Sequence, residues 1–379
     1  MAAYSVLVKP ASGLCNMHCD YCFYCDEQAK RKTASYGMMN EATLKNVIKR
    51  TLMRSEGSYS LAFQGGEPTL HGIPFFREAV NICRHYNKNH CRLQFAFQTN
   101  GYAIDEEWAA FFHDNQFLVG LSVDGTGELH DRHRHGADGG SSFTHVLQAA
   151  ALFDRYGVDY NILTVVHKET AAHIGEIYEF YKKKGWHYQQ YITCLDPLES
   201  ALQQGSKDQQ HSPYSLTAED YGTFLCRLFD LWYADYLAGK QPYIRQFENY
   251  IGILMGIEPE SCDQRGVCSR QLVVEADGSV YPCDFYALDE WKLGNFNSDL
   301  LPEIERRRDA SGFIQKSLYL DEKCISCEYL QLCRCGCRRS RIVTAEPAMR
   351  NIYCEGYRKF FAYAKERLKR CAEDAARRQ

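Results

Sequence analysis

Residues 15–22 read Cys15-Asn16-Met17-His18-Cys19-Asp20-Tyr21-Cys22, so three cysteines stand in the spacing C-x3-C-x2-C. The stretch comes shortly after an apolar run, Tyr4–Val8, that predicts a strand. A loop with three thiolates in so short a span can ligate three irons of a [4Fe–4S] cubane and leave the fourth iron open. The segment therefore predicts a cluster-binding loop after the first strand.

Other interpretations of this loop remain open from spacing alone. A zinc site would need a fourth ligand, such as Cys25 or His18. Cys19, Cys22 and Cys25 also form a C-x2-C-x2-C run that could hold a cluster. Thiols can also simply pack in a core.

Beyond the loop, apolar runs of strand length alternate with amphipathic segments of helix length to about residue 195. The predicted strands are Tyr4–Val8, Ser60–Gln64, Leu93–Gln98, Phe117–Val123, Asp159–Val166 and Tyr188–Thr193. The predicted helices between them are Glu41–Arg54, Phe75–Tyr86, Glu106–His113, Phe143–Tyr156 and Ala171–Lys184. Repeated βα units predict an α/β fold with a parallel sheet, as a partial (β/α)6 or a complete βα barrel.

Unusual residues follow the predicted strands at their carboxyl ends. The cysteine loop follows the first strand, Gly65-Gly66-Glu67-Pro68 the second and Thr99-Asn100-Gly101 the third, while Ser122 and Asp124 stand at the end of the fourth. Sites in barrels and in open parallel sheets form at this edge. We therefore expect these loops to face one cavity.

Composition indicates a globular cytoplasmic protein. Of the 379 residues, 45% are hydrophobic, and the formal net charge of −4 with dispersed Lys and Arg argues against nucleic acid as a partner. We find neither a signal peptide nor an apolar run long enough to span a membrane. Eighteen cysteines in a reducing compartment favour metal or iron–sulfur ligation over disulfides.

The chain divides into three predicted parts: residues 1–238 as the βα barrel, 239–356 as a cysteine-rich domain and 357–379 as a charged carboxyl-terminal helix. The polar stretch Glu199–Pro213 is predicted to be a loop, and an aromatic helix is predicted from Thr217 to Leu237.

The cysteine-rich domain carries the runs C-x9-G-x4-C and C-x2-C-x5-C-x3-C and a final cysteine. Its candidate ligands are Cys262, Cys268, Cys283, Cys324, Cys327, Cys333, Cys337 and Cys354. This pattern resembles a SPASM domain. The resemblance implies two auxiliary [4Fe–4S] clusters, one on Cys262, Cys268, Cys283 and Cys337, the other on Cys324, Cys327, Cys333 and Cys354. Zinc is the competing metal for such thiolate sets, and Cys335 could replace Cys337.

The first motif resembles the radical S-adenosylmethionine superfamily, because Tyr21 precedes its third cysteine and a Gly-Gly-Glu-Pro loop follows the next strand. The wider match is to anaerobic sulfatase-maturating enzymes. It rests on residues 21–24 (Tyr-Cys-Phe-Tyr), 63–70 (Phe-Gln-Gly-Gly-Glu-Pro-Thr-Leu), 98–101 (Gln-Thr-Asn-Gly), 117–125 (Phe-Leu-Val-Gly-Leu-Ser-Val-Asp-Gly) and 281–286 (Tyr-Pro-Cys-Asp-Phe-Tyr).

This resemblance implies roles for individual residues. The implied contacts of S-adenosylmethionine are Tyr21, Gly66, Glu67, Ser122, Arg134 and Leu195. Glu67 would accept hydrogen bonds from the methionyl ammonium, whereas Ser122 and Arg134 would bind its carboxylate. For Arg134 the alternatives are a solvated arginine and its neighbour Arg132. Asp284 would be the catalytic base, the alternative being an aspartate that only bonds backbone around the cluster.

The implied reaction is oxidation of a cysteine or serine in a sulfatase C/S-x-P/A-x-R motif to Cα-formylglycine, with auxiliary clusters taking the second electron. The implied partners are an unfolded or peptide-like sulfatase segment and a low-potential flavodoxin or ferredoxin, and we expect a monomer. The alternative enzyme is a radical SPASM protein that modifies another peptide. A non-enzymatic iron–sulfur carrier would leave the Gly-Gly-Glu-Pro and Ser122 loops unexplained.

Overall fold

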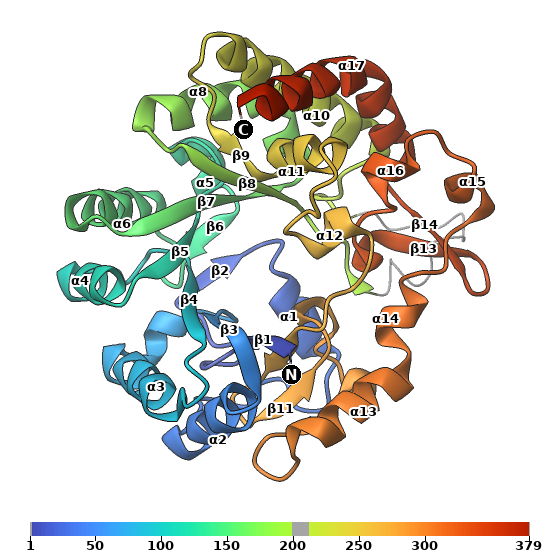
Figure 1. Ribbon diagram of the computed structural model, residues 1–379. Helices are drawn as coiled ribbons and strands as arrows, with labels where there is room; N and C mark the ends of the chain where they lie inside the picture. Colours follow the sequence, from blue (N-terminus) through green and yellow to red (C-terminus); the bar gives the residue numbers. More distant parts are fainter. Residues whose placement is uncertain (1, 199–211, 379) are drawn as a thin grey trace. The chain divides into compact units, whose positions relative to one another are not determined.

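The computed structural model describes residues 2–198 and 212–378, which form two compact units (Figure 1). The first unit comprises residues 1–123, 130–161 and 270–313, and the second comprises 124–129, 162–269 and 314–379. Most of the loop expected at 199–213 lies outside the described residues. The domain boundaries drawn from the sequence remain a prediction, because these units interleave along the chain.

The first unit is built on a run of strands in the order β12-β11-β10-β1-β3-β4-β5. Their bounds are β1 Ala2–Val8, β3 Ser55–Phe63, β4 Arg92–Thr99, β5 Phe117–Ser122, β10 Leu272–Val274, β11 Ser279–Tyr281 and β12 Gly294–Asn295. The strands β10, β1, β3, β4 and β5 pair in parallel, whereas β11 and β12 pair antiparallel. The run therefore keeps the carboxyl ends of five strands at one edge.

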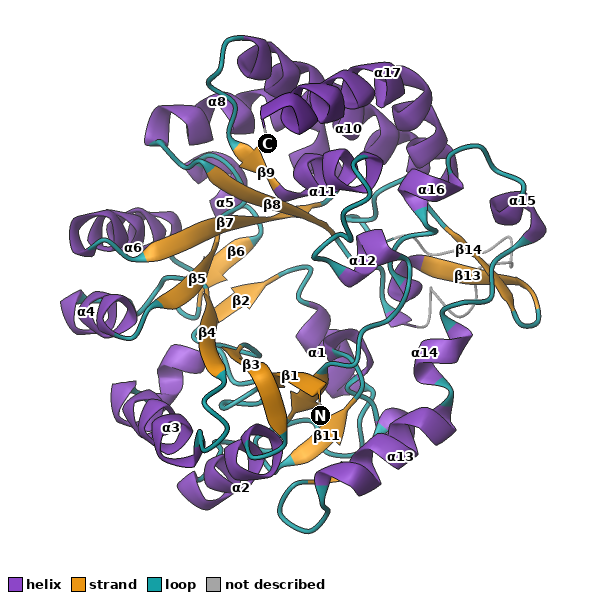
Figure 2. Cartoon of the chain, in the orientation of Figure 1, coloured by secondary structure: helices purple, strands orange, loops and turns teal. Residues whose placement is uncertain are grey.

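Helices cover this sheet as the alternating sequence predicts (Figure 2). They are α2 Glu41–Leu52, α3 Ile73–Tyr86, α4 Glu106–Asp114 and α6 Phe143–Tyr156. Helix α2 begins because the Asn40 side chain accepts from the Thr43 N–H, and α4 begins in the same way at Asp105. Strand β3 starts earlier than the predicted Ser60, because polar residues at its beginning hide the apolar pattern.

Aromatic rings fill the core between these helices and the sheet. Phe76 of α3 meets Phe63 edge to face at 4.9 Å and Phe97 at 5.0 Å, and Phe112 of α4 lies 4.9 Å from Phe97. Such pairs add about 0.5–1.5 kcal/mol each beyond the buried area. This core fixes the strands whose ends carry the candidate site.

The second unit contains a shorter parallel run, β7-β8-β9, together with the two longest described helices, α10 and α17. Its main elements are β7 Asp159–Val166, β8 Tyr188–Thr193, β9 Tyr243–Ile244, α7 Lys168–Ala172, α8 Ile174–Lys184, α10 Ala218–Leu237, α11 Arg245–Leu254 and α17 Cys354–Arg378. The single helix predicted at Ala171–Lys184 is wrong, because the chain breaks between α7 and α8 at His173. Phe229 packs edge to face on Phe247 and Phe360, joining α10, α11 and α17.

The remaining elements complete the two units. They are β2 Met17–Cys19, α1 Phe23–Ala29, η1 Pro68–His71, α5 Gly127–Asp131, β6 Arg134–Gly136, α12 Cys262–Arg265, η2 Asp284–Tyr286, η3 Asp289–Trp291, α13 Leu301–Ser311, α14 Phe313–Lys316, α15 Glu322–Ile325, α16 Leu330–Cys333, η4 Arg338–Ser340, β13 Arg341–Ala345 and β14 Ala348–Asn351.

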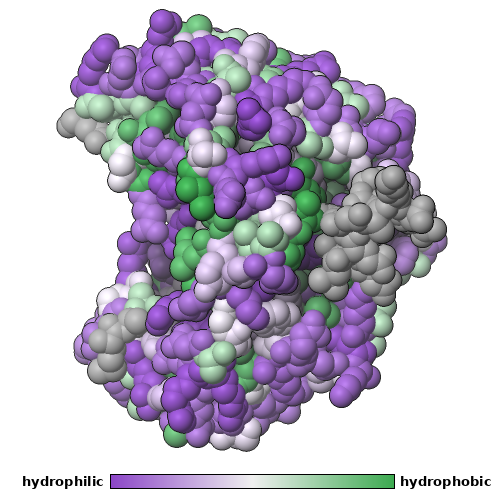
Figure 3. Space-filling model, turned by 90° about the vertical axis from the view of Figure 1, so that its right-hand side faces the viewer, coloured by the Kyte–Doolittle hydropathy of each residue, from purple (hydrophilic) through white to green (hydrophobic). Residues whose placement is uncertain are grey.

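The face drawn in Figure 3 is mostly hydrophilic, with hydrophobic residues in patches. Among the described helices, none combines the length and the apolar character that crossing a bilayer would require.

Candidate functional site

The three cysteines of the opening motif lie together in the first unit. Cys19 ends strand β2, which pairs with β6, and Cys22 is the residue that precedes helix α1. Burial and the nearby charges of Glu67, Cys19 and Cys22 raise the pKa of Cys15 to about 12, which indicates that the three sulfurs lie close together. A [4Fe–4S] cluster held by three cysteines requires their three sulfurs to lie close together.

The surroundings of Cys22 make its thiol more acidic than an ordinary cysteine. A hydrogen bond from the Cys25 side chain, the backbone N–H groups of Cys25 and Tyr24, and the charge of Arg134 lower the pKa of Cys22 to about 6, against the opposing effect of burial. A thiolate is the form that ligates iron. Cys25 lies beside Cys22 and donates a hydrogen bond to its sulfur.

The Gly-Gly-Glu-Pro loop packs directly on the cysteine loop. The N–H of Gly66 donates to the Ser12 carbonyl at 2.8 Å, and the N–H of Glu67 donates to the Leu14 carbonyl at 2.8 Å. A Cβ on Gly66 would lie 2.0 Å from that Leu14 oxygen. Gly66 is therefore needed for close approach of two backbones, which adds to the role implied for it beside S-adenosylmethionine.

Glu67 is buried and holds the ends of two strands together. Its Oε1 accepts hydrogen bonds from the Thr69 N–H, the Thr69 hydroxyl and the Thr99 hydroxyl, and its Oε2 accepts from the Asn100 N–H at 2.8 Å. Burial raises the pKa of Glu67. One acceptor site on Oε2 remains for the ammonium contact that the sequence predicts, which stays a prediction.

Asn100 links this carboxylate to the cysteine loop. Its Nδ2 donates to the Asn16 side-chain oxygen at 2.8 Å and lies 3.7 Å from the Cys15 sulfur. The loops after β1, β3 and β4 are thus one hydrogen-bonded assembly. This arrangement confirms that they come together at the carboxyl ends of the strands.

Three further residues expected at this site also lie in the first unit. Arg134 is buried in β6, with its guanidinium 5.6 Å from the Tyr21 ring centroid and 3.9 Å from the Cys19 sulfur. It is therefore not a solvated arginine. The Ser122 hydroxyl accepts from Gln98 Nε2 at 3.1 Å. Leu195, the remaining expected contact, follows β8 in the second unit and is half-buried.

Asp284 opens the short helix η2 directly after Cys283 and is buried in the first unit. Its Oδ2 accepts from the Tyr24 hydroxyl at 2.5 Å and from Gln64 Nε2 at 3.1 Å, and Gln64 also donates to Tyr24 at 2.8 Å. Its Oδ1 is buried and accepts no hydrogen bond from any described residue. The carboxylate therefore has one fixed oxygen and one that is available to a proton donor.

The environment of Asp284 makes it a stronger base than an exposed aspartate. Burial raises its pKa, although the charge of Lys9 and the hydrogen bond from Tyr24 act in the opposite direction. A carboxylate with a raised pKa is better matched to proton removal near neutral pH.

Sequence reasoning missed a buried charge cluster beside Asp284. Lys9 Nζ lies 2.8 Å from Glu275 Oε1, 4.0 Å from Glu27 Oε2 and 4.4 Å from the Tyr24 ring centroid. Arg31 bonds the same Glu275 oxygen at 2.6 Å. The available signal was a charged residue at the end of each of two apolar runs, Lys9 after Val8 and Glu275 after Val274.

Two cysteine groups lie in the second unit. Cys262 begins α12, Cys268 follows it, and Cys337 precedes η4, where its charge interacts with both of the others. The fourth ligand implied for this set, Cys283, belongs to the first unit. Of the two candidates Cys335 and Cys337, the structure therefore groups Cys337 with Cys262 and Cys268.

The other group surrounds a cavity of about 480 Å³. It is lined by Cys324, Cys327, Cys333, Cys354 and a fifth cysteine, Cys335. A set of four thiolates around one space fits a [4Fe–4S] cluster with full protein ligation. Zinc can use the same donors, and the geometry supports a thiolate metal site.

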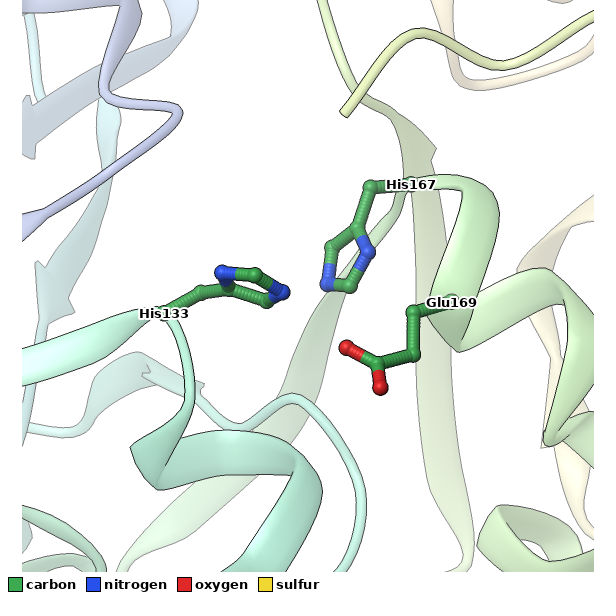
Figure 4. Close-up of side chains that lie close together, drawn as sticks. All are labelled: His133, His167 and Glu169. Carbon is green, nitrogen blue, oxygen red and sulfur yellow. The ribbon is translucent and has the colours of Figure 1, made fainter. Parts of the chain in front are cut away.

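The buried His167 has a structural role in its own helix. Figure 4 shows His167 at the start of α7 with Glu169 two residues further along. Its Nδ1 accepts from the Thr170 N–H and its Nε2 lies 2.8 Å from the Thr170 hydroxyl, so His167 caps its own helix.

Comparison with known proteins identifies related families. Residues 10–181 match the radical SAM superfamily and residues 262–328 match SPASM, an iron–sulfur cluster-binding domain. The chain is 44% identical to the cysteine-type anaerobic sulfatase-maturating enzyme of Clostridium novyi, covering all of both proteins. It is 30% identical to the serine-type enzyme of Bacteroides thetaiotaomicron, covering 94% of this chain and 88% of the relative.

A solved structure described as native anSMEcpe with bound AdoMet and Kp18Cys peptide has a TM-score of 0.90 to this chain. The two are 42% identical over 98% of this chain and 99% of that one. The expected α/β fold with radical SAM and SPASM domains is confirmed by these matches.

Proposed function

Because the chain belongs to the family of anaerobic sulfatase-maturating enzymes, we propose that it oxidises a cysteine side chain in a sulfatase Cys-x-Pro-x-Arg motif to Cα-formylglycine. The higher identity to cysteine-type relatives, 44% against 30% for a serine-type relative, supports cysteine as the target. The substrate is an unfolded or peptide-like segment of the sulfatase.

The observation that carries the proposal is the free oxygen of Asp284. Oδ1 is buried without a partner among the described residues, while Oδ2 is held by Tyr24 and Gln64. An aspartate with only a structural role would be expected to use both oxygens when it is buried. The open Oδ1 supports the role of Asp284 as the base that takes the substrate thiol proton.

When bound, S-adenosylmethionine and the clusters supply the radical that removes a hydrogen atom from the substrate Cβ and the acceptor for the electron that follows. The chain's own residues handle the proton. Asp284 Oδ1 accepts it from the thiol, and Tyr24 donates to Oδ2, which stabilises the carboxylate before transfer. Loss of one hydrogen atom, one proton and one electron leaves a thioaldehyde, which water converts to the aldehyde and hydrogen sulfide.

The residues present fit the groups that the family implies. We propose that Cys15, Cys19 and Cys22 hold the cluster with the open iron, and that Tyr21, Gly66, Glu67, Ser122, Arg134 and Leu195 contact S-adenosylmethionine. Auxiliary clusters would be held by Cys262, Cys268, Cys283 and Cys337, and by Cys324, Cys327, Cys333 and Cys354. The gathering of Cys337 with Cys262 and Cys268, and the shared cavity of the second set, support these assignments.

The remaining partners follow from the chemistry. A low-potential flavodoxin or ferredoxin would supply electrons, and the protein would act as a monomer. We place it in the cytoplasm, because so many free thiols need a reducing compartment.

The test uses protein reconstituted without oxygen and a synthetic peptide that contains Cys-x-Pro-x-Arg, with the serine peptide as a matched substrate. We expect about twelve irons per chain, four for each of three clusters, and an aldehyde product by mass spectrometry. Full iron loading and release of 5′-deoxyadenosine without peptide change would instead indicate an enzyme for another peptide. Iron near four per chain would contradict the auxiliary clusters.

A further inference from the structure

The loop that follows strand β8 carries Leu195, and side chains of the second unit hold it. The N–H of Cys194 donates to the Val166 carbonyl at 2.9 Å, so strand β7 fixes the first residue of the loop. Leu195 and Asp196 come next, lie outside strands and helices, and are half-buried. Their backbone groups need partners from elsewhere in the chain.

Arg339 bonds the backbone of this loop directly. Its Nη2 donates to the Asp196 carbonyl at 2.5 Å, and the residue is buried, with 6% of its surface exposed. A hydrogen bond from a cation to a carbonyl oxygen is stronger than one between neutral groups. Arg339 therefore fixes the residue that directly follows Leu195.

Two further side chains bond the residues on either side of Leu195. The Ser215 hydroxyl donates to Asp196 Oδ1, and the Tyr353 hydroxyl donates to the Cys194 carbonyl at 3.5 Å. Ser215 and Tyr353 are both buried. The neighbours of Leu195 are thus held in place, which is how a rigid support sets the position of a contact residue.

The backbone of Arg339 is bonded to a candidate cluster ligand. Its N–H donates to the Cys337 sulfur at 3.4 Å, and the Ser340 N–H donates to the Cys337 carbonyl at 3.1 Å. A hydrogen bond to sulfur is stronger when the sulfur is a thiolate, as it is in a metal ligand. Arg339 therefore contacts both a proposed cluster ligand and the loop of Leu195.

The other proposed contacts of S-adenosylmethionine indicate which part of it Leu195 would meet. Glu67, Ser122 and Arg134 carry groups that suit the methionyl ammonium and carboxylate. An apolar side chain offers those charged groups no hydrogen bond, but it packs well on the face of a purine ring. Leu195 is therefore matched to the adenosyl part of the molecule.

We propose that Arg339 is a positioning residue for S-adenosylmethionine. It holds the Leu195 loop where the loop meets the adenosyl group, and it joins that loop to the cluster ligand Cys337. The inference rests on the proposed function, because it assumes that the chain binds S-adenosylmethionine and that Leu195 contacts it. It gives the cysteine-rich segment a role in cofactor binding beyond that of holding clusters.

The experiment measures dissociation constants of S-adenosylmethionine and of free methionine by equilibrium dialysis, with the whole chain reconstituted without oxygen. Methionine has the amine and the carboxylate but no adenosyl group. Arg339→Met should weaken S-adenosylmethionine binding about tenfold, the effect of losing one hydrogen bond from a charged group. Methionine binding should stay at the wild-type value. Arg339→Lys keeps a cation and a donor, so it should restore part of the lost affinity.

Arg308→Met is the matched control. Arg308 is also a buried arginine that donates to a backbone carbonyl, that of Arg270 at 3.3 Å, and both residues belong to the first unit. This variant should leave both dissociation constants unchanged. Iron content and circular dichroism are measured for every variant. Arg339→Gln replaces Arg339→Met if the methionine protein does not fold or contains less iron than wild type.

The outcomes separate this inference from the proposed function. Wild-type affinity for S-adenosylmethionine in Arg339→Met would overturn the positioning role and leave the proposed function intact. Equal weakening of S-adenosylmethionine and methionine would also overturn it, because the effect would then not be confined to the adenosyl group. A wild-type chain that binds no S-adenosylmethionine would overturn the proposed function and this inference together.

Discussion

Replacing Tyr24 by Phe tests how Asp284 is kept ready to take a proton. The Tyr24 hydroxyl donates to Asp284 Oδ2 at 2.5 Å, and this hydrogen bond lowers the pKa of Asp284 against the raising effect of burial. A hydrogen bond to a charged group is worth about 1.5–3 kcal/mol. Tyr24→Phe removes that stabilisation from the carboxylate and leaves the uncharged acid nearly unaffected.

The sign of the effect follows from the need for an ionised base. Activity rises with pH as Asp284 loses its proton, so a higher pKa moves this acid limb of the rate profile to higher pH. On the limb, 1.5–3 kcal/mol corresponds to a rate about 10- to 150-fold below wild type. At pH values above this limb the rates of Tyr24→Phe and wild type converge, because Asp284 is ionised in both proteins.

The assay is the initial rate of peptide aldehyde formation across the pH range, with 5′-deoxyadenosine measured in the same samples. Tyr4→Phe is the matched control, because the Tyr4 hydroxyl also donates to a carboxylate, that of Glu305, at 2.9 Å. An acid limb at the same pH in Tyr24→Phe and wild type would refute the assigned role of this hydrogen bond.

Three further variants test the structure around the site. Lys9→Met leaves the buried Glu275 with one cation fewer and should lower the free energy of unfolding, measured by urea titration, by about 3–5 kcal/mol. An unchanged midpoint of the urea unfolding transition would contradict the ion pair between Lys9 and Glu275. Gly66→Ala places a Cβ 2.0 Å from the Leu14 carbonyl oxygen, so the cysteine loop must move. The variant should therefore contain about four irons fewer per chain than wild type. An iron content equal to wild type would contradict this expectation. Burial raises the pKa of Glu27 from 4.5 to about 8, so the folded state holds a proton that the unfolded state releases between these values. Stability should therefore fall as pH rises through that window, by at most about 1.4 kcal/mol per pH unit, and Glu27→Gln should flatten this slope.

Much of the first unit was predictable because its strands are buried by helices and its patterns are regular. The helix at Phe143–Tyr156 was predicted with its observed bounds, as was the strand at Asp159–Val166 of the second unit. Strand β3 begins at Ser55 rather than Ser60, because exposed Glu56 and Gly57 carry no apolar signal. The break at His173 was missed because neither glycine nor proline marks it. His167 precedes α7, and His173 stands between the end of α7 and the start of α8.

Pairing between distant segments was the part that local patterns could not predict. Strand β10 pairs in parallel with β1, so Leu272–Val274 joins the sheet of the amino-terminal residues. That pairing brings Glu275 to Lys9 and Asp284 to Tyr24. Periodicity describes which face of a segment is buried, but it contains no information about which strand lies beside it.

The division of the carboxyl-terminal cysteines into two sets was implied by the resemblance to a SPASM domain, because spacing alone did not divide them. The cavity with Cys324, Cys327, Cys333 and Cys354 was expected, whereas the burial of Cys335 within it was not. The left-handed turn at Cys335 depends on hydrogen bonds from Arg341 and Asn351, which no short motif encodes.

The most direct measurement of the central claim is the ratio of peptide aldehyde to 5′-deoxyadenosine in Asp284→Asn. Asparagine keeps the size of the side chain and an oxygen that can accept from Tyr24, so clusters and radical formation should persist. Removal of a general base typically costs about 10²–10⁴-fold, so aldehyde should fall by that factor while 5′-deoxyadenosine is still released. Aldehyde formation at the wild-type rate would contradict the assignment of Asp284 as the base.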